Sequence, residues 1–218
     1  MPLFKSITVP DGLLSVWHIT EPSDELLSYF TAEELADQAF RKFTFEKRKT
    51  EWLATRALLK QMIGPIAIGP TFQISYTESG KPLLNHPVYP NISISHSRDF
   101  VTVLIHKQLA VGIDIESMNR NYAPIRNRYL SEIELEHVND PENSGWLQCL
   151  YWCAKEAVFK LVEEKGVDFK KQIEVIAFDP LQNTFLARYI SGNQERTYQL
   201  QHTTFNDHCM VWVCGDQV

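Results

Sequence analysis

Two stretches decide the fold: Val111-Gly112-Ile113-Asp114-Ile115-Glu116, and Trp152-Cys153-Ala154-Lys155-Glu156-Ala157-Val158-Phe159-Lys160. The first predicts a buried strand. Residues two apart on a strand point to the same face, so Asp114 and Glu116 project together and the branched residues point the other way. Two adjacent carboxylates repel each other, and a cation between them is the usual remedy. The second stretch predicts a helix with Glu156 one turn before Lys160. Together they predict a metal site beside an acid/base and a cation.

Taken singly, each stretch has a second interpretation that remains open. An edge strand with one solvated polar face also carries alternating carboxylates. A solvated helix face also carries a Glu–Lys pair at this spacing. Trp152 and Phe159 share the face of Glu156 and argue against full solvation, because large aromatic side chains are rarely left in water. We therefore expect another segment to cover this helix face.

The composition describes a globular chain of 218 residues, with 44% hydrophobic and 22% charged residues. That length suits one large domain or two small ones. A net charge of −6 argues against a general nucleic-acid binder. The first residues lack a signal peptide, and no apolar run approaches the roughly 20 residues that cross a bilayer. We expect a cytoplasmic protein with no nucleic-acid and no membrane partner.

The four cysteines, Cys149, Cys153, Cys209 and Cys214, could in principle bind zinc. Neither sequence pair has the two-residue spacing of a zinc knuckle, and all four lie in apolar helical or strand-like stretches. We favour reduced thiols packed in the core of a cytosolic protein.

The order of elements predicts an α+β fold, because strands and helices follow one another without a regular βαβ alternation. Capping boxes at Thr31–Glu34 and Ser131–Glu134 predict helix starts, the first running towards Phe40. Longer helices are expected at residues 46–63 and 146–164. Strands are expected at residues 13–20, 72–76, 92–95, 100–106 and 109–116, followed by a four-stranded antiparallel tail at 173–178, 184–190, 197–203 and 209–213.

Four motifs in sequence order are more specific than any one alone: G-K-P (80–82), N-I-S-I-S-H-S (91–97), V-G-I-D-I-E (111–116) and W-C-A-K-E-A-V-F-K (152–160). Residues 45–160 resemble the 4′-phosphopantetheinyl transferases of the surfactin-synthetase-activating type, the longer, monomeric class. The resemblance implies two similar α+β halves related by a pseudo-two-fold, here residues 1–108 and 109–218, with coenzyme A between them. It also implies Mg²⁺-dependent, or Mn²⁺-dependent, transfer of 4′-phosphopantetheine to a serine of an apo acyl or peptidyl carrier protein, releasing adenosine 3′,5′-bisphosphate.

The resemblance also implies residue roles. Asp114, Glu116 and Glu156 match the metal-site acids. Glu156 matches the base for the carrier serine, and Lys160 matches the lysine that neutralises the pyrophosphate. The expected contacts with coenzyme A are Lys47, Arg48, Arg56, Gly80, Lys81, Pro82, Ser95, His96, Asp114, Lys155 and Lys160.

A partner surface is expected between residues 117 and 131, which contain no acidic residue. A basic and apolar patch would suit an acidic carrier protein. A solvated loop and short helix explain the same composition equally well. Two other functions also remain open, a Mg²⁺-dependent nucleotide phosphohydrolase and a non-catalytic module that binds coenzyme A or a carrier. The expected docking residues are Arg120, Tyr122, Ile125, Arg126, Arg128 and Tyr129.

Overall fold

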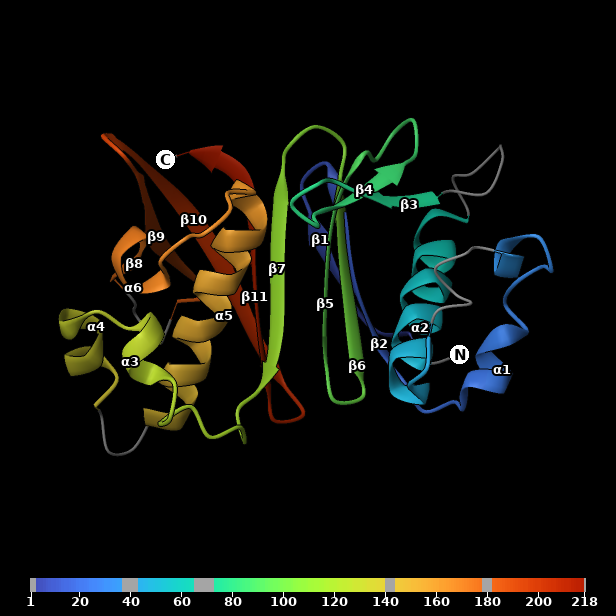
Figure 1. Ribbon diagram of the computed structural model, residues 1–218, viewed down its shortest axis with the longest axis horizontal. Coiled ribbons are helices and arrows are strands. Elements are labelled where there is room, and N and C mark those ends of the chain that lie inside the picture. The colour runs from blue at the N-terminus through green and yellow to red at the C-terminus, as the bar shows by residue number, and fades with distance from the viewer. Residues whose placement is uncertain (1–2, 37–42, 65–72, 140–143, 178–181, 218) are drawn as a thin grey trace.

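The computed structural model describes residues 3–36, 43–64, 73–139, 144–177 and 182–217, and it contains two antiparallel sheets side by side (Figure 1). The N-terminal sheet has the order β1-β2-β6-β5-β4-β3 and the C-terminal sheet the order β7-β11-β10-β9-β8. The α+β class is therefore confirmed. The N-terminal strands are β1 (Leu3–Val9), β2 (Gly12–His18), β3 (Gln73–Tyr76), β4 (Pro82–Asn85), β5 (Asn91–Ser97) and β6 (Phe100–His106); the C-terminal strands are β7 (Val111–Ser117), β8 (Ile173–Ala177), β9 (Thr184–Ser191), β10 (Gln194–Phe205) and β11 (His208–Gln217).

One long helix packs on each sheet, and the two helices lie on opposite sides of the central strands β5, β6 and β7 (Figure 1). Helix α2 (Glu46–Ile63) buries Leu53, Leu58 and Ile63 against β2 and β6, with α1 (Ser23–Leu27) alongside. Helix α5 (Ser144–Val162) packs on β7 and β11. Among the described residues, no helix is both long and apolar enough to cross a membrane.

The sequence predictions hold for the long elements. Helix α2 and strand β6 have the expected bounds, and the expected tail is present as β8 to β11. The two capping boxes are formed, since Thr31 and Ser131 exchange hydrogen bonds with Glu34 and Glu134. The second box starts α4 (Glu132–His137), whereas the first starts only a 3-10 turn, Glu34–Ala36; residues 37–40, 72 and 178 of the expected elements lie outside the described part of the chain.

Five short or edge elements were not expected: β1, α1, β4, α3 (Arg126–Tyr129) and α6 (Phe169–Gln172). Strands β1 and β4 are held by pairing with a neighbour, β2 and β3 respectively, and their burial pattern is weak. Helices α3 and α6 are one turn long, too short for a periodic signal. Residues of both, Tyr129 and Phe169, contact Trp152, so the expected cover over the aromatic face of α5 is present.

The two halves meet where β5 runs beside β7 (Figure 1). Within the described part of the chain, β5 and β7 belong to different sheets and share no backbone ladder. Instead, the hydroxyls of Ser93 and Ser95 accept hydrogen bonds from the N–H groups of Ile113 and Ile115, at 3.0 and 3.3 Å. A separate apolar cluster between the sheets buries the other face of β7; it contains Leu14, Val16, Phe100, Leu104, Val111, Ile113, Ile115, Met210 and Trp212.

Candidate active site

Gly112 brings helix α5 into direct contact with the backbone of β7. A Cβ atom at this position would lie 1.9 Å from the carbonyl oxygen of Ala157, which no side chain can tolerate. Only glycine permits this approach, and it places Glu156 and Lys160 beside the strand. The Nζ atom of Lys160 donates to the carbonyl of Ile113 at 2.9 Å and to Oδ1 of Asp114 at 2.7 Å.

Asp114 and Glu116 lie on the same face of β7, as the alternation predicted, and each meets a cation. Asp114 is 5% exposed and pairs with Lys160. Oε1 of Glu116 lies 2.6 Å from an Nη atom of Arg120, and Oε2 accepts a weaker hydrogen bond from Ser97 at 3.4 Å. Burial and the nearby Asp114 charge raise the pKa of Glu116.

Glu156 is the third acid, and the charges of Asp114 and Glu116 act on it. Burial, and then the negative charge of Asp114, raise its pKa to about 7, while Lys160 acts in the opposite direction. A carboxyl group whose pKa lies near neutral pH is partly ionised at physiological pH, and its ionised form can accept a proton. Two of the acids lie on strand β7 and the third on helix α5. In the sequence, Glu116 and Glu156 are 40 residues apart.

The residues present fit a divalent metal ion. Oδ2 of Asp114 is buried and has no hydrogen-bond partner among the described residues. A buried carboxylate oxygen without a partner is costly, and an oxygen-seeking cation would satisfy it. Mg²⁺ typically uses one or two carboxylates and completes its shell with substrate phosphate and water. Asp114, Glu116 and Glu156 supply oxygen donors of this type.

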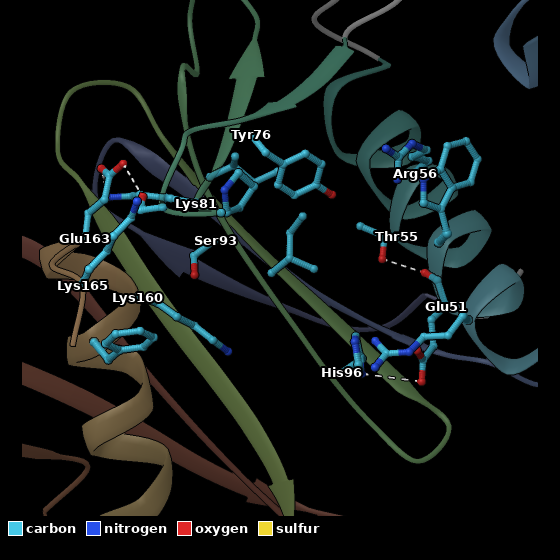
Figure 2. Close-up of a pocket in the computed structure, with 18 of the residues that line it drawn as sticks. Glu51, Thr55, Arg56, Tyr76, Lys81, Ser93, His96, Lys160, Glu163 and Lys165 are labelled. Atoms are coloured by element: carbon cyan, nitrogen blue, oxygen red, sulfur yellow. Dashed lines mark hydrogen bonds and ion pairs between the residues drawn. The ribbon is translucent and has the colours of Figure 1, made fainter. Parts of the chain in front are cut away.

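A cleft of about 590 Å³ opens between the halves and is lined by α2, β5, the turn at residues 79–82 and the C-terminal end of α5 (Figure 2). Its cationic side chains are Arg48, Arg56, Lys81, Lys160 and Lys165. A second, adjoining hollow shares Arg48, Glu51 and His96 with the first and reaches Glu116 and Arg120. The cations suit a ligand that carries several phosphates.

Most of the predicted coenzyme A residues line these clefts. Gly80, Lys81, Pro82, Arg48, Arg56, His96 and Lys160 line the first, and Lys47 lines the second. The Nζ atom of Lys81 is 3.4 Å from Glu163 and donates to the carbonyl of Leu161, so it joins the turn to α5 (Figure 2). Arg56 stacks on Trp52 at 3.6 Å. The imidazole of His96 lies 3.5 Å from Glu51, and burial lowers its pKa.

Ser95 was expected to hold a phosphate, but its hydroxyl is already engaged. It donates to Asp114 and accepts from the N–H of Ile115. Ser95 does not line either hollow, whereas Ser93, two residues earlier on β5, lines the first. The structure thus gives Ser95 contacts that position the acid and join the two halves.

The expectation that Lys155 contacts coenzyme A is wrong. Its side chain is fully buried, and the Nζ atom pairs with Glu134 at 2.7 Å while donating to the carbonyls of Phe169 and Ile173. Lys155 and Glu156 are adjacent on a helix and therefore point about 100° apart. Lys155 ties α5 to α4, α6 and β8, away from the cleft.

The expected docking patch also needs correction. Tyr122 and Tyr129 are 2% and 1% exposed and belong to the C-terminal core. Their hydroxyls donate to the carbonyls of Ser117 and Gln148. Arg120 and Arg128 are exposed, whereas Ile125 and Arg126 are half-buried. A partner could meet the arginines but not the tyrosines.

Several cleft residues were not predicted from the sequence, among them Glu51, Trp52 and Thr55 on α2. A signal was present: with Arg48 and Arg56 these residues follow the spacing of one helix face. Glu51, Trp52 and Thr55 line the cleft although each is less than 10% exposed. Other cleft residues that were missed are Phe43, Tyr76, Ser79, Ile92, Ser93, Ile94, Phe159, Glu163, Glu164, Lys165 and Gly166.

Comparison with known proteins points to one enzyme family. The model of the 4′-phosphopantetheinyl transferase superfamily matches residues 110–213. The 4′-phosphopantetheinyl transferase AcpT of Salmonella typhimurium is 28% identical over 141 residues, 62% of this chain and 69% of that protein. AcpT of Escherichia coli is 30% identical over 120 residues, 52% of this chain and 57% of that protein.

A longer alignment covers both halves. The L-aminoadipate-semialdehyde dehydrogenase-phosphopantetheinyl transferase of Rattus norvegicus is 24% identical over 221 residues, 89% of this chain and 70% of that protein. The family match includes the strand with Asp114 and Glu116 and the helix with Glu156 and Lys160. Over residues 110–213 the chain is thus similar to the 4′-phosphopantetheinyl transferase superfamily.

Proposed function

We propose that this transferase moves 4′-phosphopantetheine from coenzyme A to a serine of an apo carrier protein, with a divalent metal held by Asp114, Glu116 and Glu156. One observation carries the proposal: Gly112 allows α5 to place Glu156 and Lys160 against the acids of β7, beside a cleft lined by cations. Strand and helix acids next to a polyphosphate-sized cleft suit transfer of a phosphoryl-linked group.

The chain's own residues account for the proton and for much of the charge. The attacking serine oxygen forms a bond to phosphorus as the phosphoanhydride bond breaks, and adenosine 3′,5′-bisphosphate leaves. Glu156 is the base that takes the serine proton, and its pKa of about 7 suits that task. Lys160 lines the cleft and offsets charge on the leaving phosphate. Bound Mg²⁺ would neutralise charge on the pyrophosphate oxygens.

Coenzyme A would lie along the first cleft. Arg48, Arg56, Lys81 and Lys165 are available for its phosphates, because each lines that cleft. Lys81 is already held by Glu163 and the carbonyl of Leu161, which pre-orients its ammonium. Arg120, Arg126 and Arg128 would meet acidic residues of the carrier. We further propose that the chain acts as a monomer, since both walls of the cleft come from one chain.

The decisive experiment incubates the protein with coenzyme A, MgCl₂ and a panel of apo acyl and peptidyl carrier proteins. Mass spectrometry should show the carrier gaining one phosphopantetheinyl group, and none without metal. A carrier whose acceptor serine is replaced by alanine is the matched control. Release of adenosine 3′,5′-bisphosphate without any carrier would instead indicate a hydrolase. Binding of coenzyme A without any turnover would indicate a non-catalytic module.

A further inference from the structure

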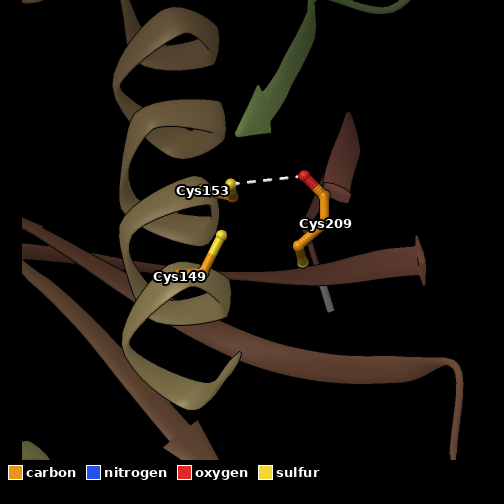
Figure 3. A group of neighbouring side chains, drawn as sticks. All are labelled: Cys149, Cys153 and Cys209. Atoms are coloured by element: carbon orange, nitrogen blue, oxygen red, sulfur yellow. Dashed lines mark hydrogen bonds between the residues drawn. The ribbon is translucent and has the colours of Figure 1, made fainter. Parts of the chain in front are cut away.

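Three cysteine sulfurs gather in the C-terminal core, where α5 packs on β11 (Figure 3). The Sγ atoms of Cys149, Cys153 and Cys209 all lie within 4.8 Å of one another. Cys149 and Cys153 are one turn apart on α5, and Cys209 faces them from β11. Each of these cysteines is 0% exposed. The fold, and not the sequence spacing, brings the three thiols together.

The separation of the sulfurs suits a single ion bound by all three. With metal–sulfur bonds of about 2.3 Å, as in zinc thiolates, three sulfurs around a central ion lie about 4 Å apart. Closing from 4.8 Å or less to this distance needs only small side-chain rotations. Sulfur donors select soft, thiophilic ions over Mg²⁺, so this cluster would not compete for the metal of the cleft.

The residues around the three sulfurs favour a bound ion whose charge balances three thiolates. Among the described residues, the sulfurs contact the Tyr122 hydroxyl and the backbone carbonyls of Glu116 and Cys209, and none contacts a cationic group. An uncompensated charge in a buried site costs several kcal/mol. Three thiolates around Cu⁺ or Zn²⁺ leave net negative charge beside Glu116. Three thiolates around a trivalent ion leave none.

We infer that Cys149, Cys153 and Cys209 form a binding site for a trivalent thiophilic metalloid of the arsenite type. The reaction is a condensation: As(OH)₃ and three thiols give three As–S bonds and three waters, with no change of oxidation state. Arsenite is uncharged at neutral pH, so its entry into a buried apolar site avoids the desolvation penalty of an ion. Binding would release no protons, whereas a divalent ion must displace thiol protons.

A ligand bound to the three cysteines would also contact the strand that carries Glu116, a residue that lines the second hollow. The thiol of Cys149 contacts the carbonyl oxygen of Glu116 at 3.7 Å, and Cys209 is the partner of Glu116 in the β7–β11 ladder. Three As–S bonds would join α5 to β11 directly behind this acid.

The test uses the reduced 218-residue chain and inorganic arsenite as the probe. We expect one arsenic per chain by native mass spectrometry, three sulfur neighbours and no oxygen in arsenic-edge X-ray absorption, and no proton release in weakly buffered solution. Cys214→Ser is the matched control, since Cys214 lies on β11 outside the cluster, and it should bind as the parent does. Cys149→Ser, Cys153→Ser and Cys209→Ser should each weaken binding at least tenfold.

The absorption spectrum of the parent protein decides the matter even if a serine variant does not fold. Oxygen neighbours around arsenic, or full binding by Cys209→Ser, would overturn the proposal. So would no arsenic binding at all. Preferential binding of zinc or Cu⁺ in an equimolar competition with arsenite would overturn the choice of a trivalent ligand.

Discussion

The hydroxyl of Ser95 lies 2.7 Å from Oδ1 of Asp114, and so a side chain of the N-terminal half holds an acid of the C-terminal half. The hydroxyl oxygen of Ser95 also accepts a hydrogen bond from the N–H of Ile115 at 3.3 Å. Lys160 contacts the same Oδ1 atom, which leaves Oδ2 of Asp114 without a hydrogen bond among the described residues. Two fixed contacts on one oxygen present the other in a defined direction.

Ser95→Ala should weaken metal binding, because Asp114 would lose one of the two contacts that orient it. We expect Mn²⁺ affinity, measured by electron paramagnetic resonance, to fall several-fold. Ser93→Ala is the matched control: Ser93 makes the equivalent bond to the N–H of Ile113 but touches no carboxylate. Both variants should lose roughly 1–3 kcal/mol of stability for the unpaired N–H. Equal Mn²⁺ affinity in the two variants would contradict the positioning role.

Removing a carboxylate from the proposed metal set should abolish stabilisation by metal. Ligand binding to the native state raises the midpoint of thermal unfolding. We expect MgCl₂ to raise the midpoint of the parent protein and to have little effect on Asp114→Asn. Glu132→Gln serves as the control, since Glu132 lies on α4 at the surface. An undiminished Mg²⁺ shift in Asp114→Asn would remove Asp114 from the metal site.

The raised pKa of Glu156 predicts a pH dependence of stability in metal-free protein. Its pKa rises from an ordinary 4.5 to about 7 on folding, so the native state binds the extra proton between these values. The free energy of unfolding should therefore fall as pH rises through that interval. Comparison of urea unfolding of the parent with Glu156→Gln isolates this contribution, because other groups cancel. Parallel pH profiles would show that the pKa is not raised.

The same group predicts a pH dependence of activity and metal binding. Glu156 must be deprotonated to accept a proton or to hold a cation. Mn²⁺ affinity of the parent should increase as pH rises towards 7 and beyond. Glu156→Gln should bind Mn²⁺ more weakly with a flatter profile, and it should lower the transfer rate by at least a hundredfold, measured with coenzyme A and an apo carrier. A full transfer rate in the variant would exclude Glu156 as the base.

Because Lys155 and Glu134 form a buried ion pair, replacing Lys155 should lower the free energy of unfolding and leave the affinity for coenzyme A unchanged. Lys155→Met leaves the Glu134 charge, which is 1% exposed, without its partner and should cost about 3–5 kcal/mol in urea unfolding. Lys155→Met with Glu134→Gln should recover part of this loss. Affinity for coenzyme A, measured by calorimetry on the folded variants, should not change. A tenfold loss of affinity for coenzyme A in these variants would show that Lys155 does contribute to coenzyme A binding.

Gly112→Ala should prevent α5 from seating on β7, because the added methyl would meet the carbonyl of Ala157. We expect strong destabilisation and loss of Mn²⁺ binding. Gly145→Ala is the matched control, since a Cβ atom there meets nothing within 4 Å and alanine favours a helix. A soluble Gly112→Ala protein with parental thermal stability would refute this explanation of the glycine.

Much of the fold could be predicted from the sequence because its long elements carry strong local signals. Helix α2 was expected from its apolar spacing and its Gly64-Pro65 stop, and β6 from a continuous apolar run. The alternation of β7 predicted that Asp114 and Glu116 share a face. Strand β1 and helices α3 and α6 were not expected, because contacts distant in sequence stabilise them and their own patterns are weak.

The sequence by itself determined the family motifs, the residue types of the candidate site and the shared face of its strand acids. Local periodicity is a property of neighbouring residues and is legible without a fold. Only the tertiary structure decided that Ser95 orients Asp114, that Lys155 is buried beside Glu134 and that three cysteines meet. Those outcomes depend on which faces of α5, β5 and β11 pack together, and long-range packing leaves no periodic trace in the chain.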